Sequence, residues 1–300
     1  MNPTATVALA DYARQHASVH AVRTAVFVDE QQVPAELERD ALDPVSIHVL
    51  ARDTGGAAVG TARLTPDRRV GRMAVLPDWR GRGVGAALLE ALVAYARTQG
   101  WPELVLHAQL HALPFYARAG FVPAGTAFAE AGIGHRLMCR RLPGACPVED
   151  VEAAATVLVG LAAHARRGLA IYSRRLDPGL LDRPDVLQAI RRFATRPGPC
   201  RVRILLHDAG GPQREDAPLL ALAQRLPSVF AVREIADPVD ARYPSAYVIN
   251  DTGGALFRPL GQRFEGEGGI EHGPAARRLA LAFEPVWERS RPCGELRALS

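Results

Sequence analysis

The segment from residue 70 to residue 92 constrains this chain more than any other. It reads VGRMAVLPDWRGRGVGAALLEAL. A strand predicted at 70–76 runs through a Pro-Asp turn into a glycine-rich turn at 80–85, and a helix predicted at 86–95 follows at once. Glycines lack the Cβ that would keep backbone N–H groups from converging on a ligand, and the first turn of a helix offers further N–H donors and the positive end of its dipole. The segment therefore predicts a cradle for a pyrophosphate.

Three kinds of nucleotide ligand are held by turns of this type. A P-loop requires a Lys directly after its last glycine, and none follows here. A dinucleotide fingerprint requires an acidic residue at the end of the next strand, whereas Glu103 precedes the strand expected at 104–108. The third pattern is R-x-x-G-x-G, which Arg80, Gly83 and Gly85 match without a gap. An ordinary glycine-rich turn between a strand and a helix is the alternative that the turn alone leaves open.

Further motifs on both sides of the turn bear on this choice. They are VRTAVFVDEQQVP (22–34), ERDALD (38–43), His48, LVLHAQ (104–109), ALPFYARAGF (112–121) and GIGHRLM (132–138). The strand paired with a helix closed by Gly120 resembles the second half of the core of the GNAT superfamily, the acyl-CoA-dependent N-acetyltransferases. The other motifs resemble its ElaA-type branch. The resemblance covers residues 1–142, slightly under half of the chain.

The predicted fold class is α/β, in two domains. The resemblance implies that residues 1–142 form a GNAT fold, a mixed sheet flanked by helices. The segment 11–20 resembles the first helix of that fold. Local patterns in this part predict strands at 47–52, 57–64, 70–76 and 104–108, a helix at 113–119 and a hairpin around Gly125 and Gly132. Residues 143–147 combine prolines and glycine without periodicity, which predicts a linker. A length of 300 residues suffices for two cores.

Residues 148–300 predict a second α/β domain with a largely parallel sheet, because strands and helices alternate along the chain. The helices are expected at 148–167, 184–194, 217–226 and 274–289. The strands are expected at 169–172, 201–207, 229–235, 246–250 and 255–259.

Residues 148–291 resemble one half of a phospholipase D-like fold, in an order that ends with a strand, a turn, a strand, a glycine-rich loop and a helix that carries Phe283 and Trp287. Active members of that group carry H-x-K-x4-D. Counted back from Asp251, the His position holds Pro244 and the Lys position holds Ala246. We therefore expect no phosphodiester chemistry in this domain and a role in binding or assembly instead.

Other polar residues of the second half leave two interpretations each. His207 and Asp208 follow an apolar strand, so they form a catalytic pair at its carboxyl end or cap the turn. His272 lies in the glycine-rich segment 266–273, which either contacts a ligand or is a disordered loop. The arginine pairs form an anion-binding face or solvated helix surfaces; they are 166–167, 174–175, 191–192 and 277–278.

The GNAT resemblance implies that acetyl-CoA is the cosubstrate and that an amine is the acceptor. It places the pantetheine arm and the thioester carbonyl on the backbone of a splayed strand, and the pyrophosphate on the glycine turn. The residues that it assigns to acetyl-CoA are Met73, Ala74, Val75, Arg80, Gly81, Arg82, Gly83, Val84, Gly85, Ala86 and Phe115.

The catalytic groups follow from the same resemblance. Tyr116 stands where the superfamily commonly keeps the general acid for the thiolate, and a phenol with an ordinary pKa of about 10 suits that role. Packing against the pantetheine is its alternative role. The general base stays open among Glu30, Glu36, His107, Glu130 and His135. A primary amine on a small molecule or a peptide is the expected acceptor, and a non-catalytic acyl-CoA sensor or binding module is the alternative function.

Composition limits the partners. The chain is 48% hydrophobic and 23% charged, as in ordinary globular proteins, and its net charge of +4 comes from arginines without a basic block, so we expect no nucleic-acid partner. The four cysteines form no C-x-x-C pair, so we expect neither a metal site nor disulfides. No signal peptide or apolar run of about 20 residues is visible, so we expect a cytoplasmic protein without a membrane partner. The sequence is compatible with an oligomer.

Overall fold

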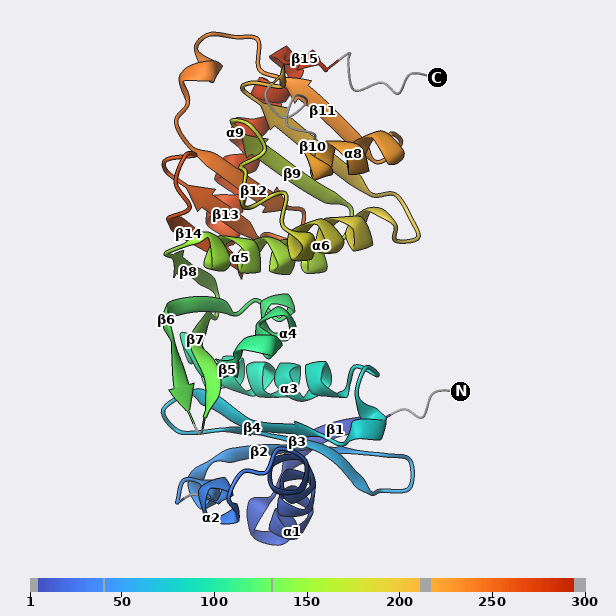
Figure 1. Ribbon diagram of the computed structural model, residues 1–300, viewed down its shortest axis with the longest axis vertical. Helices are drawn as coiled ribbons and strands as arrows, with labels where there is room; N and C mark the ends of the chain where they lie inside the picture. Colours follow the sequence, from blue (N-terminus) through green and yellow to red (C-terminus); the bar gives the residue numbers. More distant parts are fainter. Residues whose placement is uncertain (1–4, 40, 131, 211–216, 294–300) are drawn as a thin grey trace. The chain divides into compact units, whose positions relative to one another are not determined.

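The computed structural model describes residues 5–39, 41–130, 132–210 and 217–293 (Figure 1). The chain divides into two compact units. The first unit comprises residues 1–109 and 127–137, and the second comprises residues 110–126 and 138–300.

The first sheet is mixed, as the GNAT resemblance implies. Its strands are β1 (Thr6–Ala10), β2 (Ile47–Arg52), β3 (Ala58–Leu64), β4 (Arg69–Val75), β5 (Glu103–Gln109), β6 (Val122–Glu130) and β7 (Ile133–Arg141). Their order is β1-β2-β3-β4-β5-β7-β6. Neighbours from β1 to β4 are antiparallel, and β4 and β5 are parallel. The edge strand β1 was not predicted. The tip of the β6–β7 hairpin belongs to the first unit and its base to the second.

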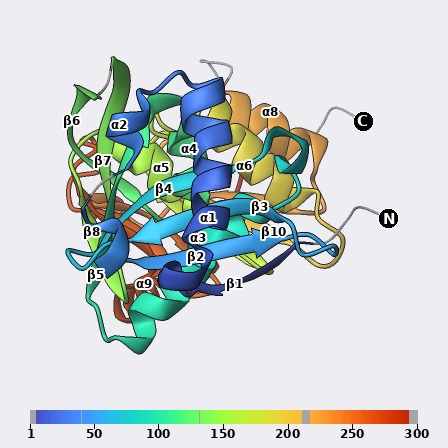
Figure 2. The ribbon, with the colours of Figure 1, turned by 90° about the horizontal axis from the view of Figure 1, so that it is seen from below.

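Helices cover both faces of the strands in the first unit. They are α1 (Tyr12–Arg23), the π-helix η1 (Thr24–Glu30), α2 (Ala35–Glu38), the short 3-10 turns η2 (Asp43–Val45) and η3 (Pro77–Trp79), and α3 (Val84–Thr98). Helices α1 and α3 lie on opposite faces of the strands (Figure 1), and α1 runs across them (Figure 2). Leu88, Leu92 and Ala96 recur every four residues and bury one face of α3. Gly60 of β3 permits its close approach, because a Cβ there would lie 3.1 Å from Leu88 Cδ1.

The second unit contains a second sheet and most of the remaining helices. Its helices are α4 (Leu113–Arg118), which follows the 3-10 turn η4 (Leu110–Ala112), then α5 (Val151–His164), α6 (Pro184–Ala194), α8 (Pro218–Arg225), the 3-10 turn η5 (Asp240–Arg242) and α9 (Gly273–Arg289). Its strands are β8 (Gly144–Val148), β9 (Gly168–Ser173), β10 (Arg201–Leu206), β11 (Phe230–Glu234), β12 (Ala246–Asn250), β13 (Ala255–Arg258), β14 (Gly266–Glu271) and β15 (Arg291–Pro292). The order is β15-β11-β10-β9-β12-β13-β14-β8.

The expectation of a largely parallel second sheet is wrong. Only β9, β10 and β11 run parallel, and helical crossovers connect them. Strands β12 and β13 are joined by a turn of four residues, and β14 and β8 continue the antiparallel arrangement. A connection as short as 251–254 cannot cross over to a parallel partner, which requires a dozen residues or more.

Two glycine- or proline-rich segments are ordered strands. Residues 144–147, which were expected in a linker, are part of β8, which pairs with β14. Pro147 is tolerated there because β8 is an edge strand, which loses no ladder bond on its open side. The interpretation of 266–273 as a disordered loop is also wrong, because it forms β14 and the start of α9. Gly269 has no room for a side chain, since a Cβ there would lie 2.5 Å from the carbonyl oxygen of Gly144.

The second sheet carries an apolar layer on each face. Along β9, Leu169 and Ile171 pack in the cluster that includes α5, α6 and α8, while Ala170 and Tyr172 pack with α9. This alternation is the period of two that a strand imposes on its side chains. The face toward α9 is rich in aromatic rings, and Phe283 stacks on Trp287 with centroids 5.6 Å apart.

Candidate functional site

The glycine turn between β4 and α3 has the geometry of an anion cradle. Gly81 and Gly83 have φ values of 72° and 85°, in the left-handed region that favours glycine. Gly83 caps α3, whose first backbone bond runs from the Ala87 N–H to the Gly83 carbonyl at 3.0 Å. The N–H groups of the first helical turn, Val84 to Ala86, therefore precede the helical bonding pattern. Among the described residues, no atom lies within 4 Å of a Cβ built on Gly81 or Gly83, so space above the turn is open.

Arg80, the first residue of the R-x-x-G-x-G pattern, pairs with a carboxylate from another element. Its guanidinium donates to both carboxylate oxygens of Glu30, at 2.8 and 2.5 Å, and its Nε donates to the Val75 carbonyl at 3.0 Å. The hydrogen bond from Arg80 lowers the pKa of Glu30, which makes this carboxylate a weak base. Arg80 thus ties the turn to the end of η1. Arg82 lies over the ring of Trp79, 5.4 Å from its centroid.

Strand β4 is bulged and diverges from β5, which confirms that it is splayed. Thr61 of β3 pairs with Ala74, and Arg63 pairs with Gly71, so β4 carries one extra residue between them. Arg72 has a φ of 49° within this bulge. The register between β4 and β5 consists of Arg69–Val105 and Val70–Leu106, and the strands separate beyond these pairs. Met73 to Val75 therefore lie along the opening that leads to the glycine turn.

Three of the six candidate catalytic residues, His107, Glu130 and His135, come together in the first unit. His107 Nδ1 and Glu130 Oε2 are 3.1 Å apart. The ring of Phe128 meets His107 edge-on at 4.9 Å and stacks on His135 at 6.1 Å. His107 lies on β5, whereas Phe128, Glu130 and His135 lie near the tip of the β6–β7 hairpin. Phe128 was missed in the sequence, where nothing distinguishes it from a core residue.

The acceptors fix the tautomers of both imidazoles. An ionised carboxylate and a backbone carbonyl only accept, so Nδ1–H of His107 donates to Glu130, and Nδ1–H of His135 donates to the Ile133 carbonyl at 2.9 Å. In each neutral ring, Nε2 then carries the lone pair. His107 has a carboxylate to orient it and to stabilise its protonated form, whereas His135 has a neutral carbonyl.

Phe115 and Tyr116 lie on α4 and fall in the second compact unit. The two rings meet edge-on at 4.9 Å, and Tyr116 also contacts the Phe121 ring at 6.1 Å. Burial raises the pKa of Tyr116 to about 12. The expectation of an unperturbed phenol is therefore wrong, because the ring is surrounded by apolar neighbours that disfavour the phenolate.

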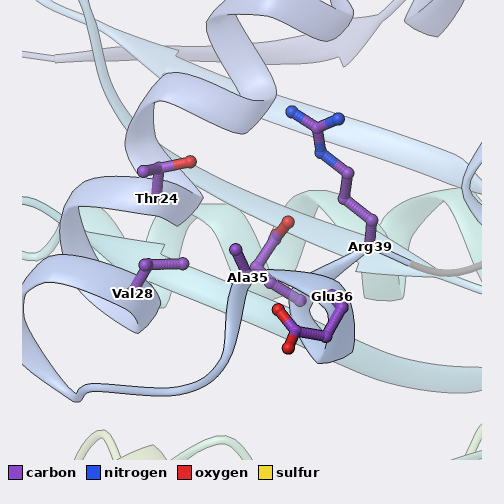
Figure 3. A pocket seen from close by; sticks show the side chains of 6 residues that line it. Thr24, Val28, Ala35, Glu36 and Arg39 are labelled. Atoms are coloured by element: carbon purple, nitrogen blue, oxygen red, sulfur yellow. The ribbon is translucent and has the colours of Figure 1, made fainter.

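A hollow of about 430 Å³ lies between η1 and α2 in the first unit (Figure 3). Thr24 and Val28 of η1 line one side, and Ala35 and Glu36 of α2 line the other. The guanidinium of Arg39 extends away from the carboxylate of Glu36, which is exposed. Glu36, a candidate base, therefore lines this hollow.

Glu38, which also lines this hollow, belongs to a buried ion network that the sequence did not predict. Arg23 is fully buried and donates to the Glu38 carboxylate, to the Glu38 carbonyl at 2.6 Å and to Asp43 Oδ1 at 3.0 Å. Arg63 donates to the same Asp43 oxygen at 2.6 Å, and His48 Nε2–H donates to the Asp43 carbonyl at 2.9 Å. The sequence pointed to the segment 38–43 and to His48 only through their resemblance to the ElaA-type branch. Asp40 of that segment lies outside the described residues.

This network makes the first unit sensitive to acid. Burial raises the pKa of Asp43, but the hydrogen bonds from Arg23 and Arg63 outweigh it and lower the pKa from 3.8 to about 2. Because the folded pKa is the lower one, the stabilisation is complete above about pH 4 and is lost as the pH falls toward 2. We expect a loss of about 2 kcal/mol over that range. Denaturant unfolding at several pH values checks this, and Asp43→Asn should flatten the dependence; an unchanged profile would contradict it.

The polar residues singled out in the second half have structural partners. The carboxylate of Asp251 accepts the backbone N–H groups of Arg166 and Arg167, both at 2.8 Å. His207 Nδ1–H donates to the Ala241 carbonyl at 3.1 Å, while Asp208 forms an ion pair with Arg175 at 3.4 Å. His207 and Asp208 therefore each have a partner of their own. His272 contacts the Glu267 carboxylate at 3.2 Å.

Together the splayed strand, the open glycine turn and the oriented imidazole are features that a group-transfer enzyme with a phosphate-bearing donor would need. In the described part of the chain, no group of three or more His, Cys, Asp or Glu side chains is placed to hold a metal ion. Within the same residues, no helix is both long and apolar enough to cross a membrane.

Comparisons with known proteins agree with this class. Residues 8–142 match the family described as acetyltransferase (GNAT) domain, and residues 150–299 match the family described as domain of unknown function (DUF7931). The chain is 39% identical over 123 residues to the uncharacterized N-acetyltransferase YjcF of Bacillus subtilis, covering 40% of this chain and 87% of that protein. It is 34% identical to UPF0039 protein C11D3.02c of Schizosaccharomyces pombe, covering 39% and 81%.

Solved structures align with the same part. Escherichia coli ElaA is 28% identical, covers 46% of this chain and 99% of its own, and gives a TM-score of 0.41. An acyl-CoA N-acyltransferase from Pseudomonas aeruginosa is 29% identical with the same coverage and a TM-score of 0.42.

The chain therefore belongs to the GNAT acetyltransferases, and it is an acyltransferase that also carries the DUF7931 domain. The match of the second half to a domain of unknown function gives no support to the phospholipase D-like interpretation, which stays a prediction.

Proposed function

We propose that the chain transfers an acetyl group from acetyl-CoA to a primary amine of a small molecule or a peptide. The observation that carries the proposal is the succession, within one unit, of a bulged strand that separates from its neighbour and a glycine turn with two left-handed residues that opens α3. A long ligand with a polar arm and a pyrophosphate fits this succession. The arm lies along Met73 to Val75, and the pyrophosphate lies against residues 81–86.

In this proposal His107 is the general base. The neutral amine attacks the thioester carbonyl, which backbone donors of β4 polarise, and the C–S bond breaks to release CoA as a thiolate. Nε2 of His107 accepts the proton that the nitrogen loses as the N–C bond forms, and Glu130 orients the ring and stabilises the imidazolium that results. The exposed carboxylate of Glu36 gives the hollow between η1 and α2 a group that suits a cationic acceptor.

Acetyl-CoA binding is tested by two nearly isosteric variants at Gly83. Asn and Asp both tolerate a positive φ better than other side chains, so both variants share the same backbone cost. Asp adds a negative charge where the pyrophosphate is expected. We therefore expect Gly83→Asp to weaken acetyl-CoA binding at least about tenfold more than Gly83→Asn, measured by calorimetric titration of the full chain. Equal affinities in the two variants would remove the cradle from the proposal.

Tyr116 is proposed to donate a hydrogen bond to the leaving thiolate. Full proton transfer from a phenol with a pKa of about 12 to a thiolate is uphill, since thiols have a pKa of about 8.5. We expect Tyr116→Phe to lower kcat about tenfold and to change the acetyl-CoA dissociation constant less than twofold, because only the leaving group gains from the bond. CoA release under saturating substrates measures this, and Tyr95→Phe on α3 is the control. An unchanged kcat, with chemistry limiting the rate, would assign Tyr116 to packing.

The acceptor is to be found by screening primary amines and peptides for release of free CoA above the rate of hydrolysis. Acetylated product must appear at the same rate as CoA. Tight acetyl-CoA binding without release by any amine would overturn the transfer to amines that we propose.

A further inference from the structure

The second compact unit contains a groove of about 290 Å³ between α4, α5 and α6. Helices α4 and α5 approach closely at Gly160, where a Cβ would lie 2.9 Å from the carbonyl oxygen of Ala117. Apolar side chains from two helices form part of the lining, among them Leu113 and Pro114 of α4 and Val159 of α5. The groove therefore offers an apolar surface large enough for a small organic molecule, at the lower end of the usual range of ligand sites.

The polar lining of this groove is strongly basic. It contains four arginines and two carboxylates, which are Arg118, Arg183, Arg192, Arg196, Glu152 and Asp185. Arg183 engages both carboxylates, with N–O distances of 3.1 Å to Asp185 and 3.5 Å to Glu152. Arg196 donates to the carbonyls of Ala165 and Ala163 at the end of α5, at 2.8 and 3.0 Å. Both carboxylates are thus already used by one arginine.

The other two arginines, Arg118 of α4 and Arg192 of α6, have no hydrogen bond or ion pair with any described residue. Burial lowers the pKa of Arg118, and the nearby positive charge of Arg192 lowers it further. The two guanidinium groups therefore repel one another across one hollow. A shared anion would reverse that repulsion, and the planar fork of arginine fits two oxygens at once.

We propose that this groove binds a small organic anion, whose carboxylate or phosphate lies between Arg118 and Arg192 and whose apolar part lies on α4 and α5. Gln188, one turn before Arg192 on α6, lines the same groove and adds an amide that can hydrogen-bond the anion. The residues that line the groove are distinct from the glycine turn, from the imidazole cluster and from Tyr116 of α4.

The neighbouring Arg191 can distinguish binding in the groove from a general effect of positive charge on α6. Arg191 and Arg192 are adjacent on α6 and both are exposed, but only Arg192 lines the groove. Arg191→Gln is therefore a matched control for Arg192→Gln, with the same change in net charge and the same helix.

The test uses the full chain and three probes of similar size, 4-phenylbutyrate, phenyl phosphate and the neutral 4-phenylbutanamide. We expect calorimetric titration to show millimolar or tighter binding of at least one anion and at least tenfold weaker binding of the amide. Arg118→Gln and Arg192→Gln should each raise the dissociation constant at least fivefold, and Arg191→Gln should leave it within twofold. The preferred probe identifies the carboxylate or the phosphate as the natural headgroup. Absence of anion binding, equal binding of the amide, or equal effects of Arg191→Gln and Arg192→Gln would overturn the proposal.

Thermal unfolding separates a binding role from a structural one. Because the two charges repel, Arg118→Gln and Arg192→Gln should leave the Tm of the free protein unchanged or raise it, while they abolish the increase in Tm that the probe produces. A lower Tm of the free variants with an intact probe effect would assign both arginines to structure. Gly83→Asp should leave probe binding unchanged, so failure at the acetyl-CoA cradle and failure at this groove are distinguishable.

Discussion

Replacement of His107 by Gln is expected to lower kcat for acetyl transfer by about 100-fold or more, while the affinity for acetyl-CoA changes little. Glutamine has a similar reach, and its amide can still donate to Glu130, but it has no nitrogen that accepts a proton from the attacking amine. The loss should therefore fall on the chemical step. CoA release with the acceptor that the amine screen identifies measures kcat, and calorimetry measures acetyl-CoA binding.

Two further variants define what His107 does. Glu130→Gln keeps an acceptor for the Nδ1–H of His107 but removes the charge that stabilises the imidazolium, so we expect a smaller loss than in His107→Gln. His16→Gln, on the exposed side of α1, is the control and should leave kcat unchanged. Normal turnover of His107→Gln, together with a large loss in His135→Gln, would transfer the role of the base to His135.

Most helices and strands could be predicted because their signals are local. The strand before the glycine turn, the turn itself and the apolar face of α3 lie within one continuous segment, and the helix began only two residues earlier than expected, at Val84. The strands β1, β8, β14 and β15 could not be found in this way. Strands β8 and β15 are short and contain proline, and half of the residues of β14 are glycine. None of these three strands shows the apolar alternation that identifies a strand.

The candidate residues of the site could be selected one by one from the sequence, but their arrangement could not. His107, Glu130 and His135 were each candidates, yet nothing local shows that β5 and the β6–β7 hairpin bring them around Phe128. The partner of Arg80 is Glu30, 50 positions away, and no local pattern predicts this pair. Long-range pairing of this kind follows from the tertiary fold, and periodicity carries no information about it.

The buried network around Arg23 leads to the largest expected loss of stability. Arg23→Met should destabilise the first unit by about 3–5 kcal/mol, because it leaves the carboxylates of Glu38 and Asp43 buried with one cation, Arg63, in place of two. The methionine fills much of the same space, so the loss reflects the uncompensated charge more than a cavity. Arg14→Met on the same helix is the control, since Arg14 is largely exposed and should cost less than about 0.5 kcal/mol.

Hydrogen exchange followed by mass spectrometry measures this effect in the full chain, because it reports each compact unit separately. Peptides from β2 and β3 should lose protection in Arg23→Met, and peptides from β9 and β10 should keep it. The double variant Arg23→Met with Glu38→Gln should regain part of the protection, because it removes one of the two carboxylates to which Arg23 donates. Full protection of β2 and β3 in Arg23→Met would show that Arg63 and His48 alone hold Asp43, and that Glu38 tolerates burial without its arginine.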